Sequence, residues 1–196
     1  RMMRGGYVER IRHGVYRIAG APPAPADGLR AVWLGLGAAE PAGDRLVRGD
    51  VDAVVSHTSA AWLHDMGDLP VNRYEFTVDR RRQTRDPEVR FHRRSLDRRD
   101  WGVVDGLPVT TPVRTIIDLA AARLDGEHLA GVVRDGLTRM HLDPDEVARA
   151  LRPFAHLYDA PLGDGEAFLV DLLRRAGLPA ATHALVRLLG QGSANA

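Results

Sequence analysis

A proline-rich segment near the start of the chain limits what the sequence can form there. Residues 20–27 include prolines at positions 22, 23 and 25. Because proline lacks a backbone N–H and has a fixed φ, this segment can continue neither a helix nor a central strand. We therefore predict an extended linker at residues 21–27, which separates residues 1–20 from a larger domain.

The residues before this linker read as a β-hairpin. The segment 7–18 holds two runs rich in valine, isoleucine and tyrosine, joined at His13-Gly14, where glycine can adopt a positive φ. Arginines on such a hairpin are typical of the wing of a winged-helix domain, whose basic side chains contact DNA phosphate. A hairpin with only a structural role is the alternative. The residues that we expect to contact DNA are Arg4, Arg10, Arg12, His13 and Arg17.

The chain after the linker mixes helical and strand patterns, so we assign it to the α/β (α+β) class. Residues 28–160 are predicted to form one domain. Apolar residues predict a short helix at 29–36, and the proline and glycines of residues 38–50 indicate a loop. Alternating apolar and polar residues predict strands at 74–78 and 89–92, which we interpret as an arginine-bearing hairpin.

Helix signals dominate the second half of the chain. Thr111-Pro112 and Asp143-Pro144 each combine an N-cap residue with proline at the first helical position. Ser56 is a further N-cap candidate. Residues 161–196 are predicted to form a C-terminal helix that ends at Gly177, followed by a frayed tail.

Two residue types are missing, and this excludes several classes of chemistry. The sequence has no cysteine, and all 27 of its basic residues are arginine. Disulfides, thiolate metal sites, Schiff-base lysines and P-loop lysines are therefore excluded. The eight histidines show no metal-ligand spacing, and Ser56-His57 lacks the flanking glycines of a nucleophile elbow. We expect no catalytic residues, no metal and no cofactor.

The formal net charge of +1 hides a strong segregation of charge along the chain. Residues 73–99 hold ten arginines against five acidic residues. Such a patch can bind phosphate or an acidic protein, although charge that protects a sheet edge from pairing is the alternative. No run of about 18 apolar residues exists, so we expect no membrane partner and a cytoplasmic location. The expected partner- or phosphate-binding residues are Arg80, Arg81, Arg82, Arg85, Arg90, Arg93 and Arg94.

Four segments in order resemble one protein family. They are HGVYRIAG at 13–20, VVSHTSAAWLH at 54–64, GDLP at 67–70 and GLPVTTPVRTIIDLA at 106–120. Together they resemble AbiEi-type antitoxins of type IV toxin–antitoxin systems, in the form found in actinobacteria. In addition, residues 163–179 resemble the start of the Vsr-like endonuclease domain that follows the antitoxin region in some relatives.

The resemblance implies a winged-helix domain that binds operator DNA and a second domain that neutralises a nucleotidyltransferase toxin. Family members usually carry three helices before the wing, so we interpret residues 1–20 as the wing of a truncated domain. We therefore expect an antitoxin that is not an enzyme, with a nucleotidyltransferase toxin as its partner and promoter DNA as a second one. A stand-alone DNA-binding regulator is the alternative.

Overall fold

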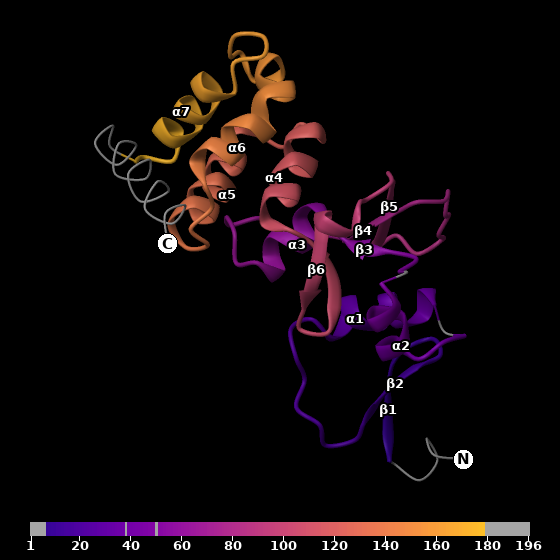
Figure 1. Ribbon diagram of the computed structural model, residues 1–196. Coiled ribbons are helices and arrows are strands. Elements are labelled where there is room, and N and C mark those ends of the chain that lie inside the picture. Colours follow the sequence, from indigo (N-terminus) through magenta and orange to yellow (C-terminus); the bar gives the residue numbers. More distant parts are fainter. Residues whose placement is uncertain (1–6, 38, 50, 179–196) are drawn as a thin grey trace, which may run out of the picture. The chain divides into compact units, whose positions relative to one another are not determined.

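A computed structural model describes residues 7–37, 39–49 and 51–178 of the chain (Figure 1). The chain divides into two compact units, each assembled from separate stretches of sequence. The first comprises Arg1–Val55 and Asn72–Val109, and the second comprises Ser56–Val71 and Thr110–Ala196. Helices and a mixed sheet occur together, so the predicted α+β class is confirmed. Arg4 lies outside the described residues.

The first unit begins with the predicted hairpin. Strands β1 (Val8–Arg12) and β2 (Val15–Ile18) pair antiparallel around a turn at Gly14, whose φ is +75°. The hairpin packs against α1 (Asp27–Leu36). Asp27 ties the two together, because its carboxylate accepts hydrogen bonds from Arg17 and from the backbone N–H of Ala24. The proline segment predicted as an interdomain linker therefore lies inside one compact unit, which corrects the expected boundary.

A five-stranded sheet has the order β5-β4-β3-β7-β6. β3 pairs antiparallel with β4 and parallel with β7, while β4 and β5 are parallel, in a register that places Phe76 beside Phe91. The strands are β3 (Val54–Val55), β4 (Tyr74–Val78), β5 (Val89–Arg93), β6 (Trp101–Val104) and β7 (Leu107–Thr110).

The parallel pairing of β4 and β5 corrects the prediction of an arginine hairpin at 73–99. Residues 79–88 do not form a tight tip but a crossover that returns the chain to the start of the neighbouring strand. Ten extended residues reach about 33 Å, twice the length of a five-residue strand. Alternating polarity is the same for both strand directions, so the sequence pattern could not distinguish them.

A second correction concerns residues 38–50, which were expected to be a loop. Helix α2 (Ala42–Arg48) forms there, between Pro41 and Gly49, whose φ of +72° closes the helix in the left-handed conformation. The core of this unit contains Leu29, Trp33, Val55 and Phe76, all nearly inaccessible to solvent. Trp33 donates a hydrogen bond from Nε1 to the carbonyl of Ala53.

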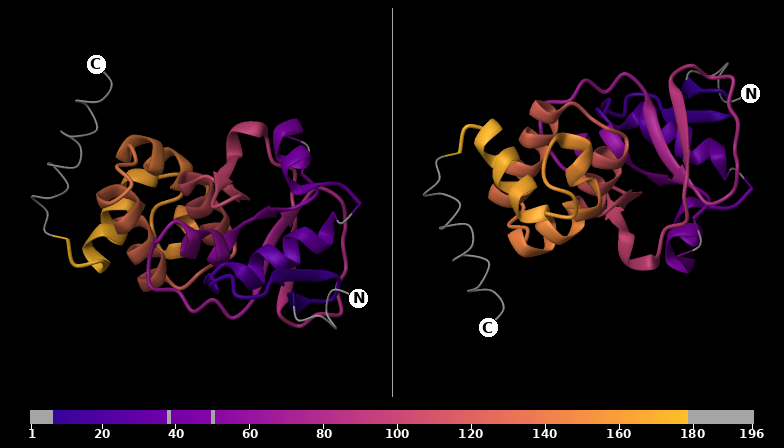
Figure 2. Two further views of the ribbon diagram at one scale, coloured as in Figure 1. Left: turned by 90° about the horizontal axis from the view of Figure 1, so that it is seen from below. Right: turned by 90° about the horizontal axis from the view of Figure 1, so that it is seen from above.

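The second unit is a helical bundle with its own core (Figure 2). As predicted, Thr111 and Asp143 cap helices that begin with proline. Ser56 precedes a helix, but its hydroxyl bonds the His57 ring and not the helix backbone. The helices are α3 (His57–Leu63), α4 (Pro112–Ala121), α5 (Gly126–Thr138), α6 (Pro144–Leu151), the 3-10 helix at Arg152–Tyr158, and α7 (Gly165–Arg175).

Helix α7 belongs to the core of this bundle. It packs on α5 and α6, and its side chains Phe168, Leu169 and Leu172 are buried. Gly165 permits this approach, since a Cβ there would lie 1.9 Å from the carbonyl oxygen of Ala148. The expected division at residue 160 is thus corrected, because the described part of 161–196 completes the second unit.

Candidate partner-binding surface

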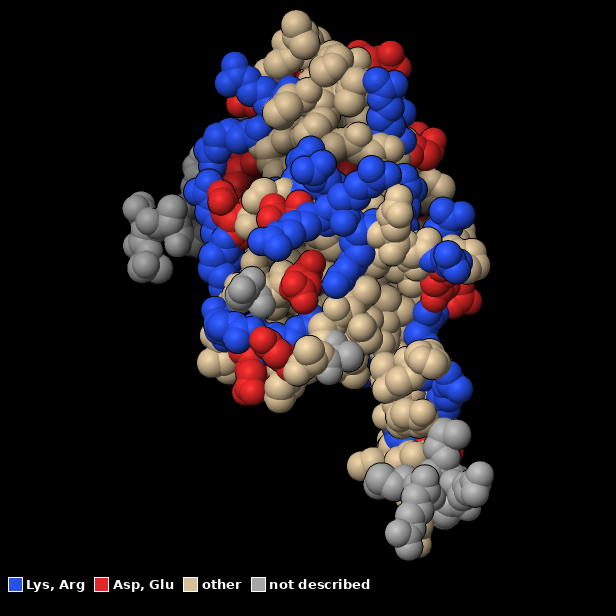
Figure 3. All heavy atoms as spheres, turned by 90° about the vertical axis from the view of Figure 1, so that its right-hand side faces the viewer, with Lys and Arg blue, Asp and Glu red and all other residues tan. Residues whose placement is uncertain are grey.

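Six of the seven arginines predicted for the second patch form an exposed set on the first unit, which we call the arginine edge. They lie on the crossover, on β5 and directly after it. None of the six forms an ion pair or a side-chain hydrogen bond with another described residue. Figure 3 shows basic side chains gathered on the face where β5 lies. The members of the arginine edge are Arg80, Arg81, Arg85, Arg90, Arg93 and Arg94.

β5 is an outer strand of the sheet. Some of its side chains belong to the arginine edge, and others face the core. Val89 is buried, whereas Arg90 and Arg93 are exposed. Arg90 lies in solvent, but His92 is half-buried, with Nε2 3.0 Å from the buried carboxylate of Glu75 on β4.

Arg82, the seventh arginine, has a different environment from its neighbours. It is half-buried, and its Nη2 donates a hydrogen bond of 3.1 Å to the carbonyl of Leu36 at the end of α1. A cation that binds the last carbonyls of a helix also complements the helix dipole. Arg82 therefore attaches the crossover to α1, and it does not project toward a partner as the sequence analysis expected.

Arg12, on the N-terminal hairpin, contacts the crossover between β4 and β5. Its guanidinium donates hydrogen bonds to Asp86 and Glu88, the acidic end of the crossover. The same guanidinium lies over the ring of Tyr74, 5.4 Å from the ring centre. These hydrogen bonds attach the crossover to the hairpin. Because the two carboxylates neutralise the guanidinium, Arg12 offers little positive charge to DNA phosphate.

Arg17 is engaged in a similar way. Its Nη2 lies 2.8 Å from Glu9 and its Nη1 lies 2.9 Å from Asp27. These hydrogen bonds, the one to Glu9 first, raise the pKa of Arg17 above its usual value. The backbone N–H of Ala24, together with Arg17, lowers the pKa of Asp27. Arg17 therefore fastens the hairpin to the start of α1.

Two of the predicted DNA contacts remain exposed. Arg10 and His13 lie at the turn end of the hairpin, where Arg10 Nη2 is 2.7 Å from His13 Nδ1. Neither pairs with a carboxylate in the described part of the chain. Of the expected DNA contacts within that part, Arg10 and His13 are thus available, while Arg12 and Arg17 are ion-paired.

A shallow hollow of about 380 Å³ lies between α1, the hairpin turn and the crossover. Apolar side chains of α1 and β5 form part of its wall, and Arg82, Gln83 and Thr84 contribute polar groups. A neighbouring hollow is lined by Gln83, Thr84 and Arg85. The crossover that carries much of the arginine edge therefore has an uneven surface into which partner side chains can fit.

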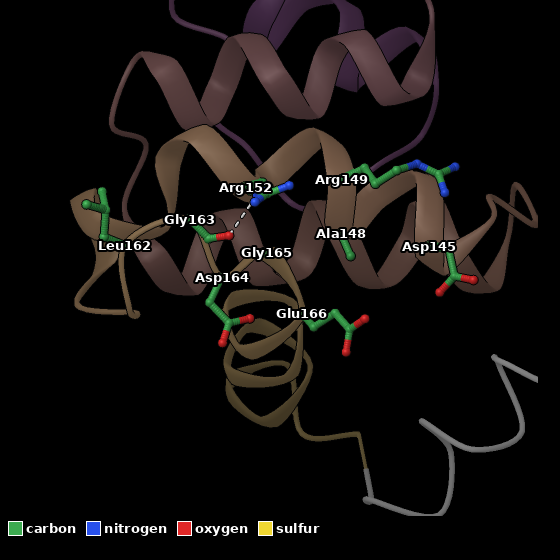
Figure 4. A pocket seen from close by; sticks show the side chains of 9 residues that line it. All are labelled: Asp145, Ala148, Arg149, Arg152, Leu162, Gly163, Asp164, Gly165 and Glu166. Atoms are coloured by element: carbon green, nitrogen blue, oxygen red, sulfur yellow. Dashed lines mark hydrogen bonds between the residues drawn. The ribbon is translucent and has the colours of Figure 1, made fainter.

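The second unit carries a larger open groove, of about 620 Å³, between α6 and the start of α7 (Figure 4). Among its lining residues, Arg152 donates a hydrogen bond of 3.0 Å from Nε to the carbonyl of Gly163. Both acidic and basic side chains line it, so the groove has no single sign of charge. It is lined by Asp145, Ala148, Arg149, Arg152, Leu162, Gly163, Asp164, Gly165 and Glu166.

The buried carboxylates of the second unit are structural. Asp118 pairs with Arg114 at 2.9 Å, as its spacing of four residues predicts. Asp135 pairs with Arg134 and accepts a hydrogen bond from the backbone N–H of Gly67. Both carboxylates are buried. Within the described ranges no three histidine or acidic residues come together as a metal site.

Sequence reasoning missed Arg45, which the expected loop at 38–50 made appear exposed. The side chain is almost fully buried on α2, and its guanidinium stacks on Trp33, 4.2 Å from the ring centre. Pro41 and Gly49, a typical start and end of a helix, were the signal that could have placed it.

Comparisons with known proteins identify the fold alone. No family model matches the chain, and no curated protein matches it. Its structure is similar to the crystal structure of the RV2827C protein from Mycobacterium tuberculosis, with a TM-score of 0.52 and 18% sequence identity. The match covers 94% of this chain and spans 66% of that protein's chain. None of the described helices combines the length and the apolar character that a membrane crossing needs.

Proposed function

We propose that this chain is an antitoxin that neutralises a nucleotidyltransferase toxin by binding, not by catalysis, in the cytoplasm. The resemblance to AbiEi-type antitoxins supplies the partner. The observation that supports a binding role is the arginine edge, because six exposed arginines form no ion pair with other described residues. Guanidinium groups make planar, bidentate contacts with carboxylates, so the edge suits an acidic protein surface.

The contacts that hold the crossover in place support the same proposal. Arg12 on the hairpin binds Asp86 and Glu88 near the end of the crossover, and Arg82 on the crossover binds the carbonyl of Leu36 at the end of α1. A partner that binds Arg80, Arg81 or Arg85 therefore meets a segment that is already anchored. Anchoring before binding reduces the entropy lost on association.

This function is tested in a host that carries, under inducible control, the nucleotidyltransferase toxin that the proposal implies. Co-expression of this chain should restore growth, and purified chain should bind the purified toxin without any change in the toxin's covalent mass. Continued growth arrest in cells that hold soluble, folded chain would rule out the antitoxin function.

A stand-alone DNA-binding regulator is the second candidate, supported by the exposed Arg10 and His13 on the hairpin. A gel-shift with the DNA upstream of the gene separates the two. Sequence-specific binding in a strain without toxin, together with failure to rescue growth, would favour the regulator. If both rescue and operator binding occur, the chain also represses its own operon, as the resemblance implies.

A further inference from the structure

The hollow between α1, the hairpin turn and the crossover has an apolar floor. Leu36 and Phe91 line it and are half-buried, next to the buried side chains of Val32 and Val89. Part of the Leu36 and Phe91 side chains is therefore exposed to solvent within a hollow of about 380 Å³. Apolar groups in a concave surface are typical of places where a partner inserts a side chain.

Gly35 keeps this hollow open. It lies in the last turn of α1 and lines the hollow. A Cβ at this position would meet no atom within 4 Å beyond its own stretch of helix, and the φ of Gly35 lies outside the left-handed region. Glycine is also less favourable in a helix than residues with a side chain. The fold therefore does not require glycine here, and the missing side chain leaves space beside α1.

Exposed positive charge flanks the hollow on two sides. Arg81 and Arg85 lie on the crossover directly before and after residues 82–84, which line the hollow. On the hairpin side, His13 lines it, and Nδ1 of His13 lies 2.7 Å from Nη2 of Arg10. None of these three arginines has a carboxylate partner among the described residues. A segment that enters the hollow therefore meets arginines on both sides.

The acidic residue that lines the hollow does not reverse this charge. The carboxylate of Asp86 accepts a hydrogen bond from Arg12, which also lines the hollow. The surface thus combines an apolar centre with a basic rim. Protein interfaces use the same arrangement, in which a buried apolar anchor is enclosed by polar contacts.

We propose that the hollow receives one large apolar side chain from an acidic segment of the protein partner. Leu36 and Phe91 contact this side chain, and the flanking arginines bind carboxylates next to it in the segment. The inference rests on the proposed function for the identity of the partner, which is the toxin. A nucleic-acid backbone fits less well, because its phosphates contact the arginines and leave the apolar floor uncovered.

Filling the hollow tests this inference while every arginine stays in place. Gly35→Trp and the smaller Gly35→Leu add an apolar side chain where the side chain of the partner would lie. Both variants should bind the toxin more weakly than the parent, by about tenfold or more, and should fail to restore growth on co-expression. Their binding of duplex DNA should stay unchanged.

Gly43→Trp is the matched control. Gly43 lies in α2 and does not line the hollow, and a Cβ there would also meet no atom within 4 Å beyond its own helix. This variant should bind the toxin and restore growth as the parent does. The inference is wrong if Gly35→Leu, folded by circular dichroism, binds the toxin as tightly as Gly43→Trp. It is also wrong if filling the hollow weakens DNA binding as much as toxin binding.

Two synthetic peptides separate this inference from the antitoxin function. EELEE and EESEE, with blocked termini, carry the same charge and differ only in the central side chain. In isothermal titration the parent should bind EELEE about tenfold more tightly, because leucine burial contributes at least that much affinity, and Gly35→Trp should not distinguish them. Equal binding of both peptides by the parent would overturn the inference. If the parent prefers EELEE but does not restore growth, the hollow is an anchor site and only the antitoxin function fails.

Discussion

Arg12, at the end of the first hairpin strand, donates a hydrogen bond to Asp86, which lies 74 residues further along the chain. Together with the Arg12–Glu88 pair, this contact makes the N-terminal hairpin a support for the crossover. The hairpin that resembles a wing in sequence is therefore an integral part of the first unit. Its residue Arg12 also fixes the position of the crossover that carries Arg80, Arg81 and Arg85.

Replacing Arg12 should destabilise the first unit modestly. Arg12→Met removes two partly exposed ion pairs and the contact with Tyr74. We expect a loss of about 1 kcal/mol, since exposed pairs and cation–π contacts each contribute less than that. Urea unfolding measures it. Arg10→Met is the control, because Arg10 has no carboxylate partner among the described residues, and an equal loss there would contradict the account.

The carboxylate of Asp27 should make stability depend on pH in the acid range. The backbone N–H of Ala24 and the guanidinium of Arg17 lower its pKa in the folded state below 3.8. A carboxyl with a depressed folded-state pKa stabilises the protein above its unfolded pKa, and this stability is lost as pH falls through the folded value.

Asp27→Asn should therefore be less stable than the parent at pH 6, and the difference should shrink as pH falls below 3.8. Urea midpoints of both proteins at pH 6, 4 and 3 would measure the convergence. A difference that stays constant down to pH 3 would show that the charge of Asp27 is not responsible.

Gly165 should tolerate no side chain. Gly165→Ala places a Cβ 1.9 Å from the carbonyl oxygen of Ala148, so α7 must move away from α6. We expect a loss of about 3 kcal/mol in the unfolding of the second unit, as for other overpacked cores. Gly131→Ala, in α5, is the control and should be neutral or stabilising, because a Cβ there would make only an ordinary contact, 3.9 Å from the Cα of Gly67. Equal stabilities of the two variants would contradict this packing.

Nucleic-acid binding by the purified chain should be weak and steeply dependent on salt. Exposed arginines supply contacts to phosphate, and each contact releases counterions on binding. Fluorescence anisotropy with duplex DNA should give an affinity that falls at least a hundredfold between about 50 and 200 mM salt. Strong preference for one sequence, maintained at high salt, would reveal a base-reading element outside this account.

Local signals in the sequence were sufficient to predict several elements. Thr111-Pro112 and Asp143-Pro144 predicted helix starts because capping involves only neighbouring residues. Alternation likewise predicted that β4 and β5 are strands, and His13-Gly14 predicted the hairpin turn. These features depend on backbone geometry within a few residues.

Features set by distant parts of the chain were not predictable from the pattern. Alternation does not encode strand direction, so the parallel pairing of β4 and β5 was read as a hairpin. The partners of Arg12 lie more than seventy residues away. Arg45 is buried because Trp33 covers it, which its own polar neighbourhood conceals. The exposure of the arginine edge was predicted because charged side chains are seldom buried, whereas the half-burial of Arg82 depends on its contact with α1.

The central claim is that the arginine edge binds the toxin, and one growth measurement tests it most directly. Arg80, Arg81, Arg85 and Arg90 are changed together to glutamate and co-expressed with the toxin. Folding should change little, because exposed charges contribute little to stability. A control reverses two exposed arginines of the second unit, Arg123 and Arg149. We predict that the fourfold variant fails to restore growth while the control restores it fully. Full rescue by the fourfold variant, present at the level of the parent, would contradict the account.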